Sequence, residues 1–520
     1  MKNEWLNKAV FYEIYPTSFY DGSGDGTGDI EGIIQKMPYV KELGCDGIWF
    51  NPFFKSEFKD GGYDITDFYA VDPRFGTYGD VVEMCKTAKK LGLKLLFDLV
   101  PGHTSDKHPW FLESQKSGRN KYSDYYIWTD HVFVWDAGYL KGMSERSGGY
   151  AVNFFAMQPS LNYGFVNPTK SWQIDYKDPR LSPLREEVIN IIKFWLKTGC
   201  DGFRIDMAWS LVKDDADGQA TKWVWQQIFS EVRKEYPDAL FIPETGVPQN
   251  TLPGGWNMDF SLPWEDTHKL MLRCEKGDAY YDYKYDKYGY NYFASHGKGS
   301  AEEFVKKYPE WLKCAAENDG YIAYITGNHD VTRVSFNRDE TDLKIYFAFL
   351  LTLPCVPFIY YGDEIGMKHL NIPTKDGGYC RTGSRTPMLW GGGANKGFSA
   401  APKEKLYLPL DESGETVAEQ KKRKDSLLNT VKSLTALRKK HGITADAKME
   451  IISAENNGYP FVYGATNSSG TIVTAVNPAA KPASADLAGA YKILDCLNCS
   501  FVKGKITFND KGYIILEKLK

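Results

Sequence analysis

The sequence of 520 residues has no excess of basic side chains. It contains 63 Lys and Arg against 67 Asp and Glu, which leaves a net charge of −4. Proteins that bind nucleic acid neutralise phosphates with a surplus of Lys and Arg, usually gathered on one face. We therefore expect no nucleic-acid partner.

An uninterrupted apolar run long enough to cross a membrane is also missing. The longest candidate, residues 345–361, is broken by Pro354 and Pro357, so we expect a buried helix followed by a buried strand there. The first eight residues carry three charged side chains and lack the apolar segment of a signal peptide. The sequence therefore predicts a cytoplasmic protein without a membrane partner, and it leaves the oligomeric state open.

Cysteine is present, but not in a pattern that indicates cross-links. The nine cysteines are scattered along the chain and odd in number. The one Cys-x-x-Cys pair, Cys496 with Cys499, has neither a second pair nor a nearby His to complete four metal ligands. We expect reduced thiols, and neither a disulfide framework nor a zinc site.

Aromatic residues, by contrast, are plentiful. The chain has 14 Trp, 34 Tyr and 29 Phe, which together make up 15% of it. This is more than the packing of a core requires, and aromatic faces also bind ligands by stacking. The composition therefore indicates stacking surfaces for a ligand.

Hydrophobic runs rich in β-branched and aromatic residues alternate with amphipathic helical stretches through most of the chain. Eight such runs are expected to be strands: residues 10–15, 47–51, 93–100, 202–206, 240–244, 256–260, 322–327 and 356–361. Eight βα units predict an α/β fold of the (β/α)8 TIM-barrel type. In such barrels the functional residues lie at the C-terminal ends of the strands.

Two further parts are expected beside the barrel. The connection between the third and fourth strands is far longer than an ordinary βα loop and predicts an inserted subdomain at residues 103–165. A helix expected at residues 421–441 ends at Gly442, and the short alternating runs after it predict a C-terminal antiparallel β domain at residues 443–520. The barrel then comprises residues 1–102 and 166–442.

Carboxylates stand at the ends of several predicted strands, where burial is costly unless they are paired or used. We interpret Asp259 as the cap of a following helix. Asp206, Glu244 and Asp330 would instead converge on the barrel mouth beside Arg204. Cleavage of a glycosidic bond needs such a set: a carboxylate nucleophile, a protonated acid, and anionic support for an oxocarbenium-like transition state.

The segments around these residues resemble the signature regions of the α-amylase superfamily, glycoside hydrolase family 13. The matching segments, in the family's order over nearly the whole barrel, are Gly62-Tyr-Asp64, Asp98-Leu-Val-Pro-Gly-His103, Gln158-Pro-Ser-Leu-Asn162, Gly202-Phe-Arg-Ile-Asp206, Glu244, Asn328-His-Asp330 and Tyr361-Gly-Asp-Glu-Ile-Gly366. The pattern is most similar to oligosaccharide-active α-glucosidases and oligo-1,6-glucosidases.

This resemblance implies roles for the three carboxylates. Asp206 would be the nucleophile that forms a covalent glycosyl-enzyme, and Glu244 would be the general acid and then the general base. Asp330 would bind the distorted sugar and stabilise the transition state. Arg204 lies two residues before Asp206, on the same side of the strand, and can keep that carboxylate ionised and oriented.

Substrate-binding residues follow from the same resemblance. Tyr63 is expected to stack on the sugar at the reacting subsite, while Asp64, His103 and His329 hydrogen-bond its hydroxyls. An arginine after the eighth strand, Arg381 or Arg385, is expected to reach the same subsite.

The activity that the resemblance implies is hydrolysis of α-1,4 or α-1,6 glucosidic bonds in short malto- or isomalto-oligosaccharides, with retention. One alternative uses the same glycosyl-enzyme but passes it to a sugar hydroxyl or to phosphate, as a transglycosylase, an isomerising synthase or a phosphorylase does. A second alternative is a non-catalytic binding module. Such modules typically lose one or more of the carboxylates, whereas all three are present here.

The segment 21–29, Asp-Gly-Ser-Gly-Asp-Gly-Thr-Gly-Asp, places oxygen atoms at alternate positions around glycine turns, a spacing that suits Ca²⁺. It resembles the first half of an EF-hand loop and a calcium loop of related oligosaccharide-active enzymes. The expected ligands are Asp21, Ser23, Asp25, Thr27 through its carbonyl, and Asp29.

The match to the family departs at several positions. Gly102 stands where the family commonly has Asn, which puts in doubt the different calcium site found between barrel and insertion in other members. Trp209 and Ser210 replace the Lys-His that endo-acting amylases usually carry after the nucleophile, and this favours short oligosaccharides. Met207 matches neither of the residues that accompany α-1,4 or α-1,6 preference, so the linkage stays open.

Overall fold

The computed structural model describes residues 3–134, 138–141, 144–273, 290–377 and 381–519. Eight parallel strands form one sheet in the order β10-β11-β12-β1-β2-β5-β8-β9. They are β1 (Phe11–Ile14), β2 (Gly47–Phe50), β5 (Lys94–Leu99), β8 (Gly202–Ile205), β9 (Leu240–Pro243), β10 (Met258–Ser261), β11 (Tyr321–Ile325) and β12 (Val356–Tyr360). The two end strands also lie side by side, because Asn257 N donates to Phe241 O across 3.1 Å. The predicted (β/α)8 barrel is confirmed.

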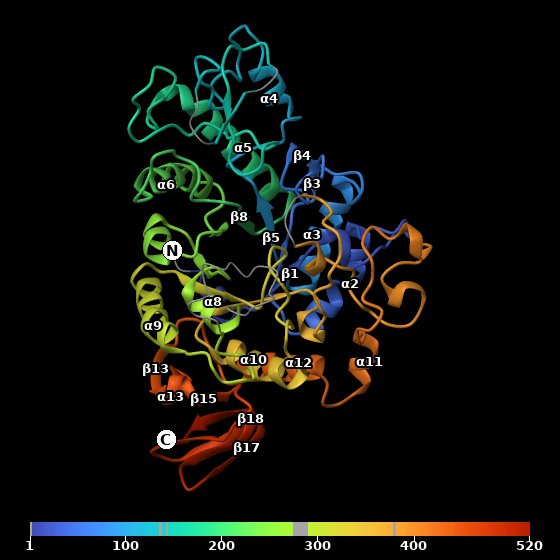
Figure 1. Ribbon diagram of the computed structural model, residues 1–520, viewed down its shortest axis with the longest axis vertical. Coiled ribbons are helices and arrows are strands. Elements are labelled where there is room, and N and C mark those ends of the chain that lie inside the picture. The colour runs from blue at the N-terminus through green and yellow to red at the C-terminus, as the bar shows by residue number, and fades with distance from the viewer. Residues whose placement is uncertain (1–2, 135–137, 142–143, 274–289, 378–380, 520) are drawn as a thin grey trace.

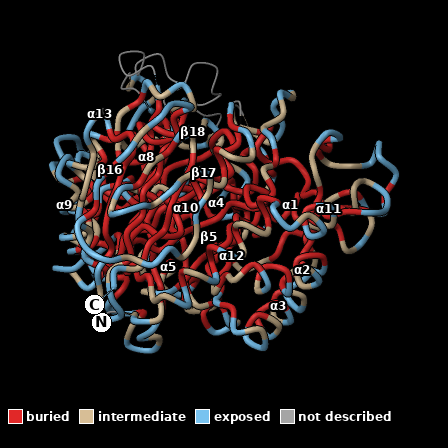
Figure 2. Tube along the Cα trace, turned by 90° about the horizontal axis from the view of Figure 1, so that it is seen from below, coloured by how far each residue is buried: buried red, intermediate tan, exposed pale blue. Residues whose placement is uncertain are grey.

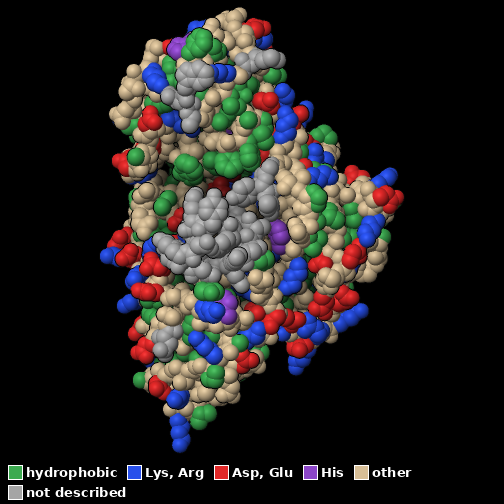
Figure 3. Space-filling view, viewed as in Figure 1, with side chains coloured by type: hydrophobic (Ala, Val, Ile, Leu, Met, Phe, Trp, Pro, Cys, Tyr) green, Lys and Arg blue, Asp and Glu red, His purple; other side chains and the backbone are tan. Residues whose placement is uncertain are grey.

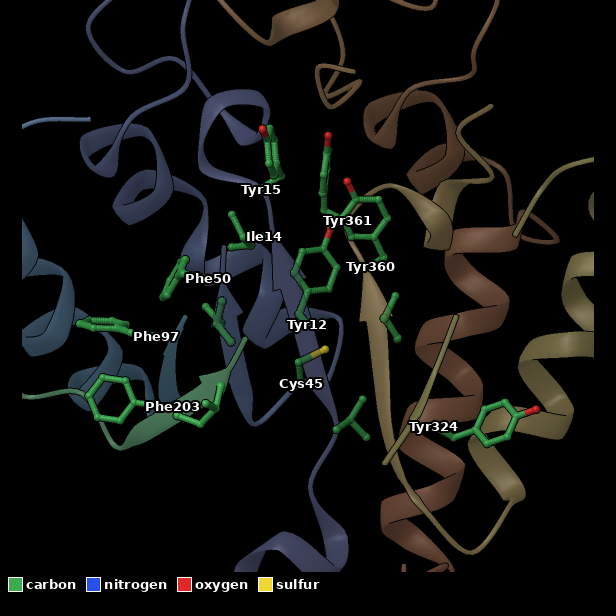
Figure 4. Close-up of a cluster of buried hydrophobic side chains, with 14 of the residues drawn as sticks. Tyr12, Ile14, Tyr15, Cys45, Phe50, Phe97, Phe203, Tyr324, Tyr360 and Tyr361 are labelled. Carbon is green, nitrogen blue, oxygen red and sulfur yellow. The ribbon is translucent and has the colours of Figure 1, made fainter. Parts of the chain in front are cut away.

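Alternation along the strands divides their side chains between two cores. One face contributes to a compact apolar cluster that includes Phe11, Trp49, Leu96, Leu240, Met258, Phe260 and Phe358. The other face packs against the surrounding helices in a single large cluster. Figure 4 shows part of that cluster, in which Phe50, Phe97 and Phe203 come from register partners on β2, β5 and β8.

Helices surround the barrel, and buried positions fill its middle while exposed ones form the rim (Figure 2). The longer helices are α2 (Ile30–Glu42), α3 (Tyr78–Leu91), α5 (Ser182–Thr198), α6 (Gln219–Arg233), α9 (Glu302–Glu317), α10 (Glu340–Thr352) and α12 (Leu427–Lys440). Shorter ones are α1 (Pro16–Phe19), α7 (Pro248–Thr251), α8 (Asp266–Leu272) and α11 (Val417–Lys422). The run at 345–361 divides into α10 and β12, both buried, as predicted.

Two details of the helices differ from the sequence prediction. The helix expected from residue 421 begins at Leu427, because Ser426 accepts a hydrogen bond from Asn429 N and caps it there. Asp259 caps no helix: it lies within β10, and α8 is preceded by Glu265 instead. Within the described residues, no helix is long and apolar enough to cross a membrane.

The segment between β5 and β8 forms a lobe at the top of Figure 1. It carries α4 (Pro109–Ser114) and the short pair β6 (Tyr139–Leu140) and β7 (Tyr150–Ala151). An isolated bridge between His103 and Ser160 ties it to the barrel. A further pair, β3 (Phe54–Ser56) and β4 (Ile65–Val71), follows β2. On the face in Figure 3, apolar side chains gather beneath this lobe.

The C-terminal part is a separate antiparallel sheet below the barrel (Figure 1). Its strands are β13 (Lys448–Ser453), β14 (Phe461–Asn467), β15 (Gly470–Asn477), β16 (Ala483–Asp486), β17 (Tyr491–Val502) and β18 (Lys505–Lys518), with α13 (Glu455–Gly458) between the first two. The order is β13-β14-β15-β18-β16, and β17 also pairs with β18. The predicted C-terminal β domain is confirmed, while the residue at which each domain begins stays a prediction.

Candidate active site

A pocket of about 430 Å³ opens at the C-terminal ends of the barrel strands. The residues that line it are Asp60, Tyr63, His103, Phe154, Phe155, Gln158, Asp206, Met207, Trp209, Glu244, Trp264, Asp330 and Arg381. They include the three carboxylates singled out in the sequence, which follow β8, β9 and β11. Since parallel strands end at the same edge of the barrel, residues distant in sequence meet there.

Arg204 occupies the centre of the charge network. Its Nη1 donates to Asp206 Oδ1 at 3.0 Å and to Asp98 Oδ1 at 2.9 Å, and its Nη2 lies 2.5 Å from Glu244 Oε1. Burial raises the pKa of Asp206 to about 7, although Arg204 opposes the shift. The guanidinium thus orients both carboxylates from below and reduces the free-energy cost of ionising them.

Glu244 follows Pro243 at the end of β9. The main chain just after the neighbouring strand β8 also binds its carboxylate. Met207 has a positive φ of 42°, an uncommon conformation for a side-chain-bearing residue, and its N–H donates to Glu244 Oε2 at 3.1 Å. Burial raises the pKa of Glu244 to about 7, with the nearby charge of Asp206 adding to the effect. The carboxyl is therefore suited to carry a proton near neutrality.

Asp330 has the opposite electrostatic environment. Burial alone would raise its pKa, but His329, whose Nε2 lies 3.2 Å from Asp330 Oδ2, and two arginines hold it well below the usual value. His329 in turn contacts Glu13 through Nδ1 at 2.9 Å, and the two carboxylates raise its pKa to about 9 against the effect of burial. Asp330 is thus held as an anion beside an imidazole that is protonated near neutral pH.

One arginine after the eighth strand, Arg381 or Arg385, was expected from the sequence, and in the structure both contact Asp330. Arg381 Nη1 donates to Asp330 Oδ1 at 2.7 Å, and Arg385 Nη2 donates to the same oxygen at 3.0 Å. Arg381 also pairs with Asp60 and lines the pocket, whereas Arg385 is buried behind it and donates through Nε to His329 O at 2.8 Å.

Tyr63 and His103 both line the pocket, and their contacts with a sugar stay a prediction. The Tyr63 hydroxyl donates to Asp98 Oδ2 at 2.9 Å and lies 2.7 Å from His329 Nε2, and its ring stacks on that imidazole. His103 Nε2 lies 3.1 Å from the Tyr63 carbonyl, and burial lowers the pKa of His103 to about 4. His103 is therefore a neutral hydrogen-bonding group.

The side chain of Asn153 occupies the space beside Gly102. A Cβ at this position would approach Asn153 Nδ2 to 2.7 Å, and Asn153 lies 3.2 Å from His103 Nδ1. Lys213 Nζ donates to Asn153 Oδ1 at 3.3 Å and to Ser210 O at 2.8 Å. A lysine ammonium thus bridges insertion and barrel at this point.

Asp64 lies outside the pocket, and the structure places Asp60 there instead. The Asp64 carboxylate is fully buried and accepts from Ser56 Oγ at 2.9 Å and from the N–H groups of Lys59 and Asp60 at 3.1 Å. Asp60 Oδ2 accepts from Gln158 Nε2 at 2.6 Å. Only Asp64 was expected from the sequence, and Asp60, which lies four residues earlier, was missed; the turn at Gly61 and Gly62, both with positive φ, lies between the two aspartates.

The loop expected to bind calcium is closed by its own hydrogen bonds. Asp21 accepts from Gly24 N at 2.6 Å and from Gly26 N at 2.7 Å, and Asp29 accepts from Gly32 N at 2.6 Å as the cap of α2. Asp25 is exposed and accepts from Thr27 N at 2.8 Å. Among the residues that the structure describes, no three His, Cys, Asp or Glu side chains gather closely enough to hold a metal. Calcium stays a prediction.

Comparison with known proteins accounts for this arrangement. The model of the alpha amylase catalytic domain matches residues 13–447. The chain is 30% identical over 491 residues to a trehalose synthase/amylase of Mycobacterium tuberculosis, covering 87% of this chain and 78% of that protein. It is 30% identical over 547 residues to an oligo-1,6-glucosidase of Parageobacillus thermoglucosidasius, covering 90% and 89%.

Solved structures share the fold over nearly the whole chain. An isomaltulose synthase variant from Erwinia rhapontici superposes with a TM-score of 0.81 at 24% identity and covers 99% of each chain. A trehalose-6-phosphate hydrolase from Bacillus licheniformis gives a TM-score of 0.80 at 24% identity, covering 99% of this chain and 100% of that one. The family match, the barrel and the pocket agree, and the chain belongs to the α-amylase family of glycoside hydrolases.

Proposed function

We propose that this enzyme hydrolyses α-glucosidic bonds, α-1,4, α-1,6 or both, in short malto- or isomalto-oligosaccharides with retention of configuration. The observation that carries the proposal is the single guanidinium of Arg204, which contacts both Asp206 and Glu244. Retaining enzymes need their two carboxyl groups about 5–5.5 Å apart, whereas inverting enzymes separate them by about 6.5–9.5 Å. A bridge by adjacent nitrogens of one side chain favours the shorter spacing.

The reaction then proceeds in two displacements. Asp206 attacks the anomeric carbon while Glu244 donates its proton to the departing glycosidic oxygen, so the C1–O bond breaks and a covalent glycosyl-enzyme forms. Glu244, now a carboxylate, takes a proton from water, whose oxygen attacks the same carbon and releases Asp206. Asp330, held anionic by His329 and the two arginines, stabilises the positive charge that develops in each transition state.

The lining of the pocket supports the proposal that the substrates are short and are bound at one end. Asp60, Gln158 and Arg381 form a hydrogen-bonded polar group in the lining. Three aromatic residues from different loops also line the pocket: Phe154 is 58% exposed, Trp209 is 61% exposed, and Trp264 is half-buried. Polar groups suit the hydroxyls of a terminal glucosyl unit, and exposed aromatic faces suit the ring of the departing sugar.

A second candidate function uses the same intermediate. If a sugar hydroxyl or phosphate replaces water, the enzyme is a transglycosylase, an isomerising synthase or a phosphorylase. The similarity to a trehalose synthase/amylase supports this candidate, as does the likeness to an isomaltulose synthase.

A substrate panel separates these functions. The enzyme is incubated with maltose, isomaltose, sucrose and trehalose, with and without phosphate, and the products are resolved. We expect free glucose from at least one α-glucoside and a loss of about 10³-fold or more in kcat for Asp206→Asn. Consumption of substrate without free glucose would favour the second candidate, and an active Asp206→Asn variant would contradict both.

A further inference from the structure

Asp259 is a buried carboxylate in β10 that the reaction itself does not use. Its side chain is fully buried and accepts four hydrogen bonds: from Thr245 Oγ1 at 2.7 Å, Thr251 Oγ1 at 2.7 Å, Gly246 N at 3.2 Å and Phe260 N at 2.7 Å. Two of the four donors, Thr245 and Gly246, are the residues that directly follow Glu244. No other described side chain accepts a hydrogen bond from both.

A carboxylate at this position is costly. Burial raises the pKa of Asp259 to about 6, and the donated hydrogen bonds act against that shift. An apolar side chain would fill the same space without desolvating a charge. The hydrogen bonds of Asp259 nevertheless have a specific effect, because they fix the direction of the turn at Gly246, whose φ of 81° is in the left-handed region.

The location of this contact matters for Glu244. Strands β9 and β10 are the first and last strands of the barrel sheet. The main chain after β9 therefore lacks the backbone hydrogen bonds to a neighbouring strand that support the ends of the other strands on both sides. On its other side Glu244 is fixed, since its N–H donates to Ile205 O at 2.9 Å and its carboxylate contacts Arg204 and Met207. On the β10 side, Asp259 supplies the hydrogen bonds to the two residues that follow Glu244.

We propose that Asp259 is a positioning residue for Glu244: by binding Thr245 and Gly246 across the seam between β9 and β10, it holds the proton of Glu244 on the line to the departing glycosidic oxygen. This inference rests on the proposed role of Glu244 as general acid. A shift of about 1 Å in a catalytic group can lower the rate about 100-fold, so even modest loosening of this turn affects proton transfer.

The test compares two substrates that differ in their need for a proton. A disaccharide such as isomaltose or maltose, whichever the enzyme cleaves, has a sugar leaving group that requires general-acid catalysis. α-Glucosyl fluoride loses fluoride without a proton. The readout is kcat/KM, which reports only the steps up to departure of the first leaving group. The variants are Asp259→Ala, Asp259→Asn and Thr245→Val, with Glu244→Gln as reference.

We expect Asp259→Ala and Thr245→Val to lower kcat/KM for the disaccharide about 10- to 100-fold and to leave that for the fluoride nearly unchanged. Asp259→Asn should retain more activity than the alanine variant, because an amide can still accept the two N–H bonds. Thr251→Val is the matched control: it removes a donor to the same Asp259 oxygen from α7, away from Glu244, and should have the smaller effect.

Each outcome decides one question. Equal losses on both substrates, or no loss on the disaccharide, would overturn the positioning role and leave Asp259 as a structural residue. Thr245→Val settles the matter if Asp259→Ala does not fold. If Glu244→Gln itself fails to discriminate between the two substrates, the assignment of Glu244 as general acid falls, which is a failure of the proposed function and not of the positioning role alone.

Discussion

Arg204 on β8 donates to Asp206, two residues later in the chain, across 3.0 Å, and its other terminal nitrogen contacts Glu244. Lys in this place would carry the charge but only as a single point, so it could not orient both carboxylates. We expect Arg204→Lys to lower kcat about 100-fold or more. Steady-state kinetics on the preferred disaccharide measure the effect. Arg180→Lys, which alters an exposed ion pair with Asp178, is the control, and an equal loss there would discount the prediction.

The pH dependence should be bell-shaped around neutrality. Asp206 must be ionised and Glu244 protonated, and burial raises the pKa of each to about 7. Activity therefore falls on the acid side as the nucleophile gains a proton, and on the alkaline side as the acid loses one. A profile of kcat/KM from pH 4 to 10 measures both limbs. Activity that stayed constant from pH 7 to 10 would contradict the assignment of Glu244.

Trp209 should act on the leaving group alone. Its exposed ring lines the pocket and, in the proposed function, stacks on the departing sugar. Trp209→Ala should lower kcat/KM for a disaccharide about 3- to 10-fold, the size of one stacking contact, and leave α-glucosyl fluoride unaffected. Phe133→Ala removes another exposed aromatic ring, one outside this pocket, and should change neither value. A loss on both substrates would place Trp209 in the glucosyl-binding part of the site.

Substitution of Asp60 should affect activity, whereas substitution of Asp64 should affect stability. Asp60 lines the pocket and binds Gln158 and Arg381, so Asp60→Asn should raise KM and lower kcat with little change in Tm. Asp64 lies outside the pocket and accepts hydrogen bonds from Ser56, Lys59 and Asp60, so Asp64→Asn should lower the free energy of unfolding by about 1–3 kcal/mol and leave the folded enzyme active. Kinetics and thermal unfolding of both variants provide the comparison. The reverse pattern would restore the role that the sequence suggested for Asp64.

We propose that the loop at residues 21–29 binds calcium, as its oxygen spacing indicates. Calcium should then raise Tm and a chelator should lower it, because an ion bound only to the folded state stabilises that state. Asp25 is exposed, and within the loop its carboxylate accepts a hydrogen bond only from Thr27 N. Asp25→Ala should therefore abolish the change of Tm with calcium and chelator. A wild-type Tm that ignores both additions would show that the hydrogen bonds of Asp21 and Asp29 are sufficient for this loop.

The order and type of the elements follow from the sequence, since short apolar runs of strand character alternate with amphipathic helical stretches along the barrel. Arg204 and Asp206 could be placed together because residues two apart on a strand share a face. Glu13 follows the same rule, two residues after the inward-facing Phe11, and could have been found in this way.

Side-chain directions in the turns were decided only by tertiary structure. Asp60 pairs with Arg381 and accepts from Gln158, both far away in the chain, whereas Asp64 accepts from the nearby Ser56, Lys59 and Asp60. From the sequence, Asp259 was interpreted as a helix cap. In the structure it accepts hydrogen bonds from Thr245 and Gly246 after β9, and only the closure of the barrel brings this segment beside β10. The sequence by itself determined the barrel, its C-terminal sheet and the position of its carboxylates at the strand ends. Which of the neighbouring polar groups face the pocket depended on contacts across the barrel, and those exist only once the chain has folded.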